Sequence, residues 1–390
     1  MSHPSRMLNL AGVPFKLETD AAMVADVRAR VQAARFPAQQ AGADWETGTP
    51  LDYMRRLRDY WLGSFDWKRW VDRINAFEHR MVDVGGEGIH VIVEVGSGTD
   101  PVPLLMTHGW PGSFVEFMDI IDPLAHPERH GGRVEDAFTV IVPSLPGYGL
   151  SPAPASPIAP VKIGALWSSL MTECFQADRY VAYGSDWGSL VTAAMAFDHA
   201  EHLSGIMITT SGVSPDFAAG PPMSPEELEF AGRLQAAMTN EVGYQAIQST
   251  KPQTLAYAQT DSPIGLAAWI VEKFQGWTVP GSREDPPFSM DVLLANVMLY
   301  WIGGSLAPSW LYMFLDSNMQ PRTGKARVPA AFMLPPDDLF PPVPRCWLER
   351  VYDVVDYTIA GVGHFPGLDS PNALVDELRR TLLPLARLAA

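Results

Sequence analysis

The stretch YVAYGSDWGSLVTAAMAF at residues 180–197 decides the fold of this chain. Its first five residues suit a buried strand, and the run from Leu190 onward predicts an apolar helix. Between them, Gly184-x-Asp186-x-Gly188 has the glycine pattern of a nucleophile elbow, a sharp strand-to-helix turn that raises one side chain above a sheet. Asp186 stands at the nucleophile position. A carboxylate there can attack a saturated carbon that bears a leaving group and form an ester, although an aspartate that only caps the helix is an alternative interpretation.

Short apolar runs with β-branched residues continue on both sides of this stretch. They alternate with helical segments, which is typical of parallel strands buried on both faces of a sheet. The expected strands lie at 103–107, 138–142, 180–184, 205–209, 328–334 and 354–360. The fold class is therefore α/β with a mostly parallel central sheet. After Ser211 the strand rhythm stops until Val328, which predicts a helical insertion at 212–325.

The N-terminal part of the chain is aromatic and helical in pattern, and we expect no strand in it before Met81. One helix is expected to begin at Thr49-Pro50-Leu51-Asp52, with the threonine hydroxyl as its cap. A hairpin that turns at Gly85-Gly86-Glu87-Gly88 follows. The expected parts are an N-terminal meander with the first hairpin at 1–95, a sheet core at 96–211 and 326–390, and a helical lid at 212–325.

A second turn of interest is His108-Gly109-Trp110-Pro111-Gly112-Ser113, which follows the strand expected at 103–107. A tight turn at that place can direct a backbone N–H toward the nucleophile. We expect the N–H groups of Trp110 and Trp187 to form an oxyanion hole. His108 is interpreted as a residue that fixes the backbone of the turn rather than as a catalytic one.

The C-terminal part of the chain supplies a candidate base and a candidate acid. His364 stands in a glycine-rich loop, Gly361-Val362-Gly363-His364-Phe365, directly after the last expected strand. Asp337 and Asp338 follow the strand before it, and the residues alone do not decide between them. The order nucleophile, acid, histidine is that of α/β-hydrolases, in which the histidine activates water.

The composition excludes several classes of protein. The 390 residues carry 44 acidic against 28 basic side chains, a formal net charge of −16, so no nucleic-acid partner is expected. Cys174 and Cys346 fit neither a disulfide scaffold nor a zinc template. The cluster Asp198-His199-Ala200-Glu201-His202 lacks the histidine spacing of a helical metal site, so we expect no metal and no organic cofactor.

No apolar segment of the length of a signal sequence or a membrane span is found in the sequence. A cytoplasmic protein without a membrane anchor is therefore expected. The aromatic N-terminal block could cover either the rest of its own chain or a second subunit, so a homodimer is left open.

Together these motifs resemble those of epoxide hydrolases of the microsomal type, and the resemblance covers nearly the whole chain. It rests on HGWPGS (108–113), PSLPGYGLS (143–151), GSDWGS (184–189) and GVGHF (361–365). It rests further on an N-terminal block with RFP (35–37), DW (44–45), TPLDYMRRLRDYW (49–61) and FDWKRWVDRINAF (65–77). The resemblance implies an α/β-hydrolase fold with a helical lid and an N-terminal meander, in a soluble enzyme like the bacterial members.

The resemblance also implies a role for individual residues. Asp186 matches the family nucleophile, His364 the base and Asp338 the relay acid. Family members use two lid tyrosines to protonate the oxygen of the opening epoxide. GYQAIQSTKP places one of them at Tyr244, and SWLYMFLD places the other at Tyr312. Without the family, both tyrosines could simply be packing residues.

The expected reaction converts a small hydrophobic epoxide and water into a vicinal diol through an ester on Asp186. A haloalkane dehalogenase is the nearest alternative, since it shares an aspartate nucleophile followed by tryptophan. The two lid tyrosines and the N-terminal meander argue against it. A catalytically silent fold that binds a hydrophobic ligand is a third hypothesis.

Overall fold

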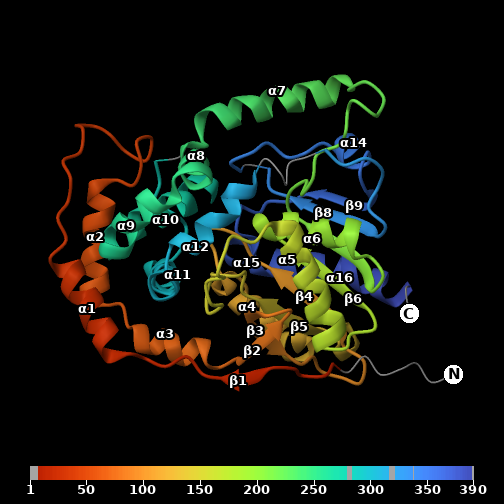
Figure 1. Cartoon of the computed structure of the whole chain (residues 1–390), viewed down its shortest axis with the longest axis horizontal. Coiled ribbons are helices and arrows are strands. Elements are labelled where there is room, and N and C mark those ends of the chain that lie inside the picture. Colours follow the sequence, from red (N-terminus) through yellow and green to blue (C-terminus); the bar gives the residue numbers. More distant parts are fainter. Residues whose placement is uncertain (1–7, 279–282, 316–320, 337, 389–390) are drawn as a thin grey trace.

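The computed structural model describes residues 8–278, 283–315, 321–336 and 338–388, and a nine-stranded sheet forms its centre (Figure 1). In sheet order the strands are β1 (Val13–Phe15), β2 (Glu78–Val84), β3 (Glu87–Glu94), β5 (Phe138–Pro143), β4 (Val102–Thr107), β6 (Tyr180–Gly184), β7 (Leu203–Ile208), β8 (Pro329–Leu334) and β9 (Asp353–Ile359). The strands from β5 to β9 pair in parallel, and those from β1 to β5 pair antiparallel. The predicted α/β class and mostly parallel sheet are thus confirmed.

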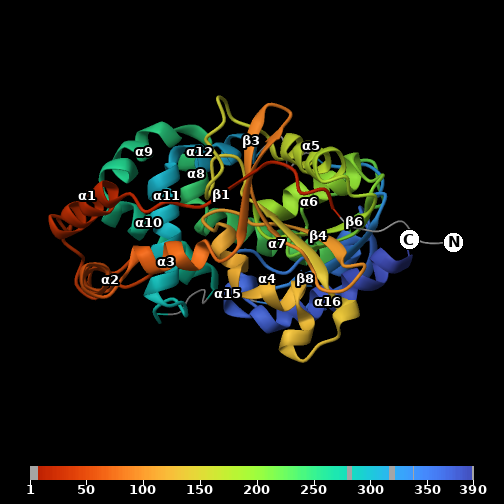
Figure 2. The same ribbon diagram turned by 90° about the horizontal axis from the view of Figure 1, so that it is seen from below.

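Helices cover both faces of the parallel part of the sheet (Figure 2). On one face lie α5 (Pro160–Ser169), its continuation Leu170–Cys174 and α6 (Trp187–Asp198). On the other lie α4 (Met118–Ala125), α15 (Pro366–Asp369) and α16 (Pro371–Leu388), with the short turns Phe114–Phe117, Pro127–His130 and Val134–Asp136 close to α4 in the chain. The central strands β4, β5, β6 and β7 are fully buried, which explains their continuous apolar sequences.

The six strands expected from apolar runs all form, and their ends differ from the expected bounds by no more than two residues. The hairpin turn is also confirmed. Gly85 and Gly86 have φ of 62° and 92°, the backbone that a two-residue hairpin turn requires, and Asp83 accepts a hydrogen bond from the Gly86 N–H.

Two expectations for the N-terminal part are wrong. β1 is a strand that lies before Met81, and it forms because its backbone pairs with β2 at the edge of the sheet. Thr49 does not cap the helix that follows it: its hydroxyl donates instead to the carbonyl of Ala268, 2.8 Å away. Both outcomes depend on partners that are distant in the sequence.

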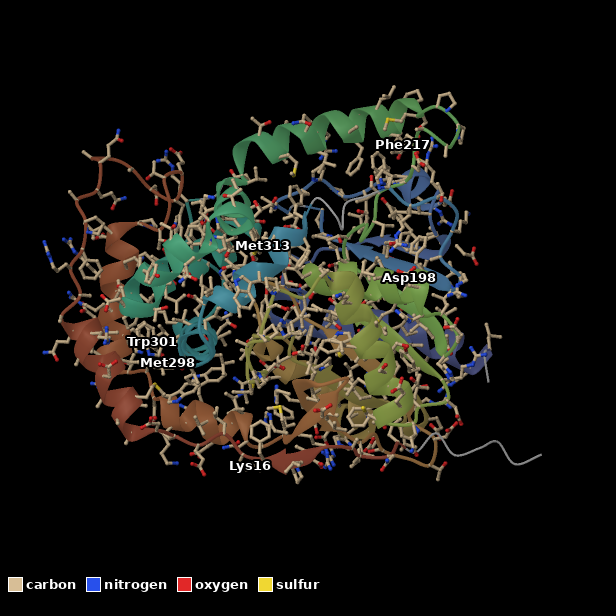
Figure 3. All side chains as sticks on the ribbon, in the orientation of Figure 1. Lys16, Asp198, Phe217, Met298, Trp301 and Met313 are labelled. Atoms are coloured by element: carbon tan, nitrogen blue, oxygen red, sulfur yellow. The ribbon has the colours of Figure 1, made fainter. Side chains whose placement is uncertain are left out.

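The N-terminal helices lie against helices from the segment between β7 and β8. They are α1 (Ala21–Gln32), α2 (Leu51–Gly63) and α3 (Trp67–Ile74). The segment contains α7 (Pro225–Asn240), α8 (Gly243–Thr250), α9 (Pro252–Asp261), α10 (Pro263–Thr278), α11 (Met290–Gly303), α12 (Leu306–Ser309) and the turn η5 (Trp310–Phe314). Trp301 of α11 lies on the side of α1 (Figure 3), and the Arg30 guanidinium is 5.9 Å from its ring.

Helix α7 lies apart from the other helices of this segment, above β8, β9 and α14 (Arg345–Leu348) (Figure 1). It begins with a capping box, in which the Ser224 hydroxyl and the Glu227 carboxylate each accept from the other's backbone N–H. Phe217 lies near that end of the helix (Figure 3) and packs against Trp347.

Within the described ranges, no single helix is both long and apolar enough to span a bilayer; only α11 taken together with Leu306–Phe314, which is bent from it by 97°, passes by length and composition. In the same ranges, no group of three or more His, Cys, Asp and Glu side chains could hold a metal ion. Asp198 and Glu201 of the sequence cluster pair instead with Arg322 and Arg327.

Candidate active site

The turn between β6 and α6 holds Asp186 in an unusual backbone conformation, with φ 48° and ψ −123°. Its side chain makes no capping bond to α6, so the interpretation of Asp186 as a simple helix cap is wrong. Glycine is needed on both sides of it. A Cβ atom on Gly184 would lie 2.1 Å from the carbonyl oxygen of Gly188, and one on Gly188 would lie 2.0 Å from that of Thr107. The elbow predicted from the sequence is confirmed, and its strain is of the kind found at functional sites.

The turn after β4 comes close to this aspartate. The Trp110 N–H donates to Asp186 Oδ1 over 2.8 Å, as expected of one half of an oxyanion hole. A Cβ atom on Gly109 would lie 2.1 Å from the same oxygen, so only glycine allows the carboxylate to come so near. Among the described residues the backbone N–H of Trp187 has no hydrogen bond to Asp186, and its part in the hole stays a prediction.

His108 has the structural position expected of it. It is fully buried, and its Nε2 accepts from the Leu145 N–H over 3.3 Å while Nδ1 lies 3.1 Å from the Gly109 carbonyl. These contacts join the turn after β4 to the loop after β5. Burial lowers the pKa of His108 to about 4, which keeps the ring neutral.

His364 lies between two carboxylates. Its Nδ1 is 2.9 Å from Asp338 Oδ1, and its Nε2 is 3.4 Å from Asp186 Oδ2. Burial alone would lower the pKa of His364, but the charges of Asp338 and Asp186 raise it well above its ordinary value. The residues that the sequence predicts as nucleophile, base and orienting acid, Asp186, His364 and Asp338, therefore lie together in the structure. Asp337, the other candidate acid, lies outside the described residues.

The two tyrosines come from different elements and meet over the elbow. The Tyr244 ring of α8 is stacked on Trp110, with 5.2 Å between centroids and 6° between planes. The Tyr312 ring of η5 stands edge-on to both, 5.6 Å from Tyr244 and 5.5 Å from Trp110. Both are buried, which raises the pKa of each hydroxyl and keeps it protonated.

A cavity of about 390 Å³ opens at these residues. Asp186, Asp338, His364, Tyr244 and Tyr312 contribute to its wall, together with Trp187. The remaining wall is mostly apolar and includes residues of α7, the end of β8, the loop after it and α14: Phe230, Leu234, Met238, Leu334, Leu339, Phe340, Val343 and Trp347. Among the described residues of the wall, only Asp186, Asp338 and His364 carry ionisable acidic or basic groups apart from the two tyrosines, so the cavity suits an uncharged, apolar molecule.

Three residues near the site were not identified from the sequence. Gln245 donates from Nε2 to the Tyr244 hydroxyl over 2.9 Å. Lys273 and Trp277 of α10 contact the Tyr244 ring, and Trp277 also lies 4.7 Å from the His364 ring. The signal for Lys273 is local, since it is a single lysine between Trp269 and Trp277 in an apolar helix. The neighbouring sequence does not indicate which residue Lys273 faces in the fold.

Comparisons with known proteins identify the family and the fold of the chain. A family model described as "Epoxide hydrolase N terminus" matches residues 13–117, and one described as "alpha/beta hydrolase fold" matches residues 102–254. Epoxide hydrolase 1 of Sus scrofa is 32% identical over 401 residues, which cover 94% of this chain and 87% of that protein. A homologue from Stigmatella aurantiaca (strain DW4/3-1), whose own assignment is provisional, is 36% identical over 94% of this chain and 83% of its own length.

Solved structures agree as well. The juvenile hormone epoxide hydrolase of the silkworm Bombyx mori superposes with a TM-score of 0.85 at 26% identity, over 97% of this chain and 95% of the other. The Aspergillus niger epoxide hydrolase superposes with a TM-score of 0.83 at 26% identity, over 98% and 99%. Neither the haloalkane dehalogenase nor the silent binder is favoured by these relatives. The chain therefore belongs to the epoxide hydrolases, with their N-terminal domain on an α/β-hydrolase fold, and acts as a hydrolase on epoxides.

Proposed function

We propose that Asp186 opens the epoxide by direct attack, and that the ester formed on it is hydrolysed with the help of His364 and Asp338. One observation carries this assignment. Asp186 lies in the wall of an apolar cavity, with one oxygen 2.8 Å from the Trp110 N–H and the other 3.4 Å from His364 Nε2. A carboxylate fixed in this way faces the substrate in the direction that attack requires.

In the first step an Asp186 oxygen bonds to one ring carbon, and the ring carbon–oxygen bond breaks with its electron pair on the oxygen. A tyrosine hydroxyl of the cavity wall gives that oxygen a proton, which leaves a hydroxyalkyl ester and a phenolate. Tyr244 and Tyr312 are the candidates, because both line the same cavity as Asp186.

The second step uses His364 as a base. Ester formation removes the charge of Asp186, one of the two carboxylates that raise the pKa of His364. His364 then gives up its proton more readily, and that proton neutralises the phenolate. The free Nε2 takes a proton from water, whose oxygen adds to the ester carbonyl. The Trp110 N–H, with that of Trp187 as predicted, stabilises the oxyanion.

Collapse of this adduct releases the vicinal diol and restores the Asp186 carboxylate and the protonated His364. In the first turnover, one oxygen of the diol comes from Asp186. Asp338 holds the Nδ1 side of His364 throughout, since both of its oxygens lie within 3.0 Å of that nitrogen. No metal or organic cofactor takes part in these steps.

The parts of the chain are assigned from their place relative to the cavity. Residues 212–325 are proposed as the lid, because α7, α8 and η5 contribute to the cavity wall. Residues 96–211 with 326–390 are proposed as the catalytic core, and residues 1–95 as the meander that supports the lid. A cytoplasmic location and a homodimer stay predictions.

The test is the mass of the ester. His364→Gln mixed with styrene oxide should gain the mass of one whole epoxide, because the ester forms and is not hydrolysed. Asp186→Ala combined with His364→Gln should gain nothing, and the exposed His202→Gln should turn over like the wild type. If the His364→Gln protein gains no mass while the wild type makes diol, the covalent route is wrong. An alkyl adduct formed only from haloalkanes would support the dehalogenase instead.

A further inference from the structure

Lys273 is a buried cation beside the active site. Its side chain is 9% exposed although it carries an ammonium group, and it pairs with the carboxylate of the neighbouring Glu272. Buried lysines are rare, since removing the charge from water is unfavourable unless the protein provides partners for it. A buried ammonium group beside the active site therefore suggests a functional role for Lys273.

Besides Glu272, the Lys273 ammonium contacts aromatic rings, and the nearer of the two is that of Tyr244. Lys273 Nζ lies 4.7 Å from the centre of that ring and 5.9 Å from the Trp269 ring. A second contact reaches the same tyrosine at its other end, where Gln245 Nε2 donates to the hydroxyl oxygen over 2.9 Å. In the described part of the chain, no lysine or arginine lies over the Tyr312 ring.

Both contacts favour the phenolate over the phenol. The ring of a phenolate carries more negative charge, so a cation at the ring stabilises it more strongly. A hydrogen bond to an ionised acceptor is also stronger than one to a neutral acceptor. Burial raises the pKa of Tyr244, and the hydrogen bond from Gln245 opposes that rise.

The other charged and titratable groups near Tyr244 include Asp186, Asp338 and Tyr312, with His364 in the wall of the same cavity and Glu272 paired with Lys273. The negative charge of Asp186 disfavours a phenolate in the resting enzyme. That charge disappears when Asp186 becomes an ester. Ring opening therefore moves one negative charge from Asp186 to a tyrosine, and the tyrosine with a cation beside it is the better recipient.

We infer that Tyr244, rather than Tyr312, gives the proton to the opening epoxide oxygen, and that Lys273 and Gln245 are positioning residues that stabilise its phenolate. Tyr312 keeps its proton and holds the epoxide oxygen by a hydrogen bond. This inference rests on the proposed function, in which an ester forms on Asp186.

The experiment measures the rate of ester formation by intact mass, in the His364→Gln protein with styrene oxide in a single turnover. Lys273→Met, which keeps the length and removes the charge, should slow ester formation by roughly tenfold. Lys273→Arg should restore the rate to within about threefold, and Gln245→Met should slow it by a few fold. Lys251→Met, at an exposed lysine before α9, should leave the rate unchanged.

A double-mutant cycle separates the electrostatic role from packing. In a Tyr244→Phe background Lys273→Met should cause no further loss, while in a Tyr312→Phe background the roughly tenfold loss should persist. Equal losses in both backgrounds would make Lys273 a packing residue and overturn the inference. Failure of the His364→Gln parent itself to form any ester would overturn the proposed function, and this inference with it.

Discussion

The reactivity proposed for Asp186 depends on neighbouring groups that restrict the conformation of its backbone and side chain. The backbone at φ 48° is strained for an aspartate, and it is held there by the Ser189 N–H, which donates to the Asp186 carbonyl over 2.9 Å. The Trp110 N–H fixes the side chain. A nucleophile that is already oriented loses little entropy when it attacks, so the position of the neighbouring backbone is as important as the carboxylate itself.

Gly109→Ala tests this close fit. The new Cβ would lie 2.1 Å from Asp186 Oδ1, so the carboxylate must move and kcat/KM for styrene oxide should fall by about 100-fold or more. Gly361→Ala is the control on the loop of His364, because no atom lies within 4 Å of its new Cβ. Equal activity of the Gly109→Ala enzyme and the wild type would show that the approach of the turn to Asp186 is not needed.

At the scale of elements, α7 contributes to the cavity wall and lies apart from the other helices of its segment (Figure 1). One arginine holds its first turn: Arg350 forms an ion pair with Glu227 and also donates to the carbonyls of Pro221 and Pro222. Glu227 is 1% exposed, and the bond to Arg350 lowers the pKa of its carboxyl. The position of Phe230, Leu234 and Met238 in the cavity wall thus depends on Arg350.

Arg350→Met should therefore loosen α7. Leaving Glu227 buried without its cation should lower the free energy of unfolding by about 3 kcal/mol, raise KM for styrene oxide and speed proteolytic cleavage before α7. Denaturant unfolding, steady-state kinetics and limited proteolysis check these effects. Arg133→Met removes an exposed pair with Glu135 and should change the free energy by less than about 0.5 kcal/mol. A variant with unchanged KM and cleavage would mean that α7 is held by its apolar contacts alone.

At the scale of the whole molecule, the N-terminal helices connect the edge of the sheet to α10, which carries Lys273 and Trp277. β1 pairs at the sheet edge, and the chain then runs along the molecule to α1 and α2 (Figure 2). Side chains there bind the proposed lid at several places, among them Thr49 at Ala268, Arg30 at Asp261 and Arg56 at Asp285. These contacts join the N-terminal part to the segment that carries Lys273 and Trp277.

Stability should also depend on pH across the whole molecule. Burial lowers the pKa values of His79, His90 and His108, so the unfolded chain binds more protons and stability should fall as pH drops below about 6.5. Burial raises the pKa of Glu116 to about 8, and the carboxylates beside His364 raise the pKa of that group. Both hold their protons more tightly when folded, so the stability that Glu116 contributes should fall between about pH 4.5 and 8, and that of His364 should fall as pH rises above about 6.5.

Glu116→Gln isolates one of these groups. The neutral amide can still accept from Ser185, which lies 3.2 Å from Glu116 Oε1, and it does not titrate. Between pH 4.5 and 8 the free energy of unfolding of the wild type should fall by up to about 1.4 kcal/mol per pH unit because of Glu116. The variant should not show this fall. Urea midpoints at pH 5, 7 and 9 measure the difference. Parallel curves for the two proteins would show that Glu116 does not hold a proton in the folded state.

The sequence by itself determined six strands of the sheet, the elbow and the order of Asp186, an acid at Asp337 or Asp338, and His364. Each depends on a local property, such as a short apolar run or a glycine where backbones come close, and such properties are written in neighbouring residues. The tyrosines entered through the resemblance, since nothing local separates them from packing residues.

Only the tertiary structure decided the rest. The three residues of β1 become a strand because β2 offers unpaired backbone groups, and Thr49 binds Ala268 in place of its own helix. The Lys273 charge lies at the Tyr244 ring because α10 packs beside α8, although the two residues are far apart in the chain. Contacts between distant segments depend on how all the elements pack together, and no short stretch of sequence contains that information.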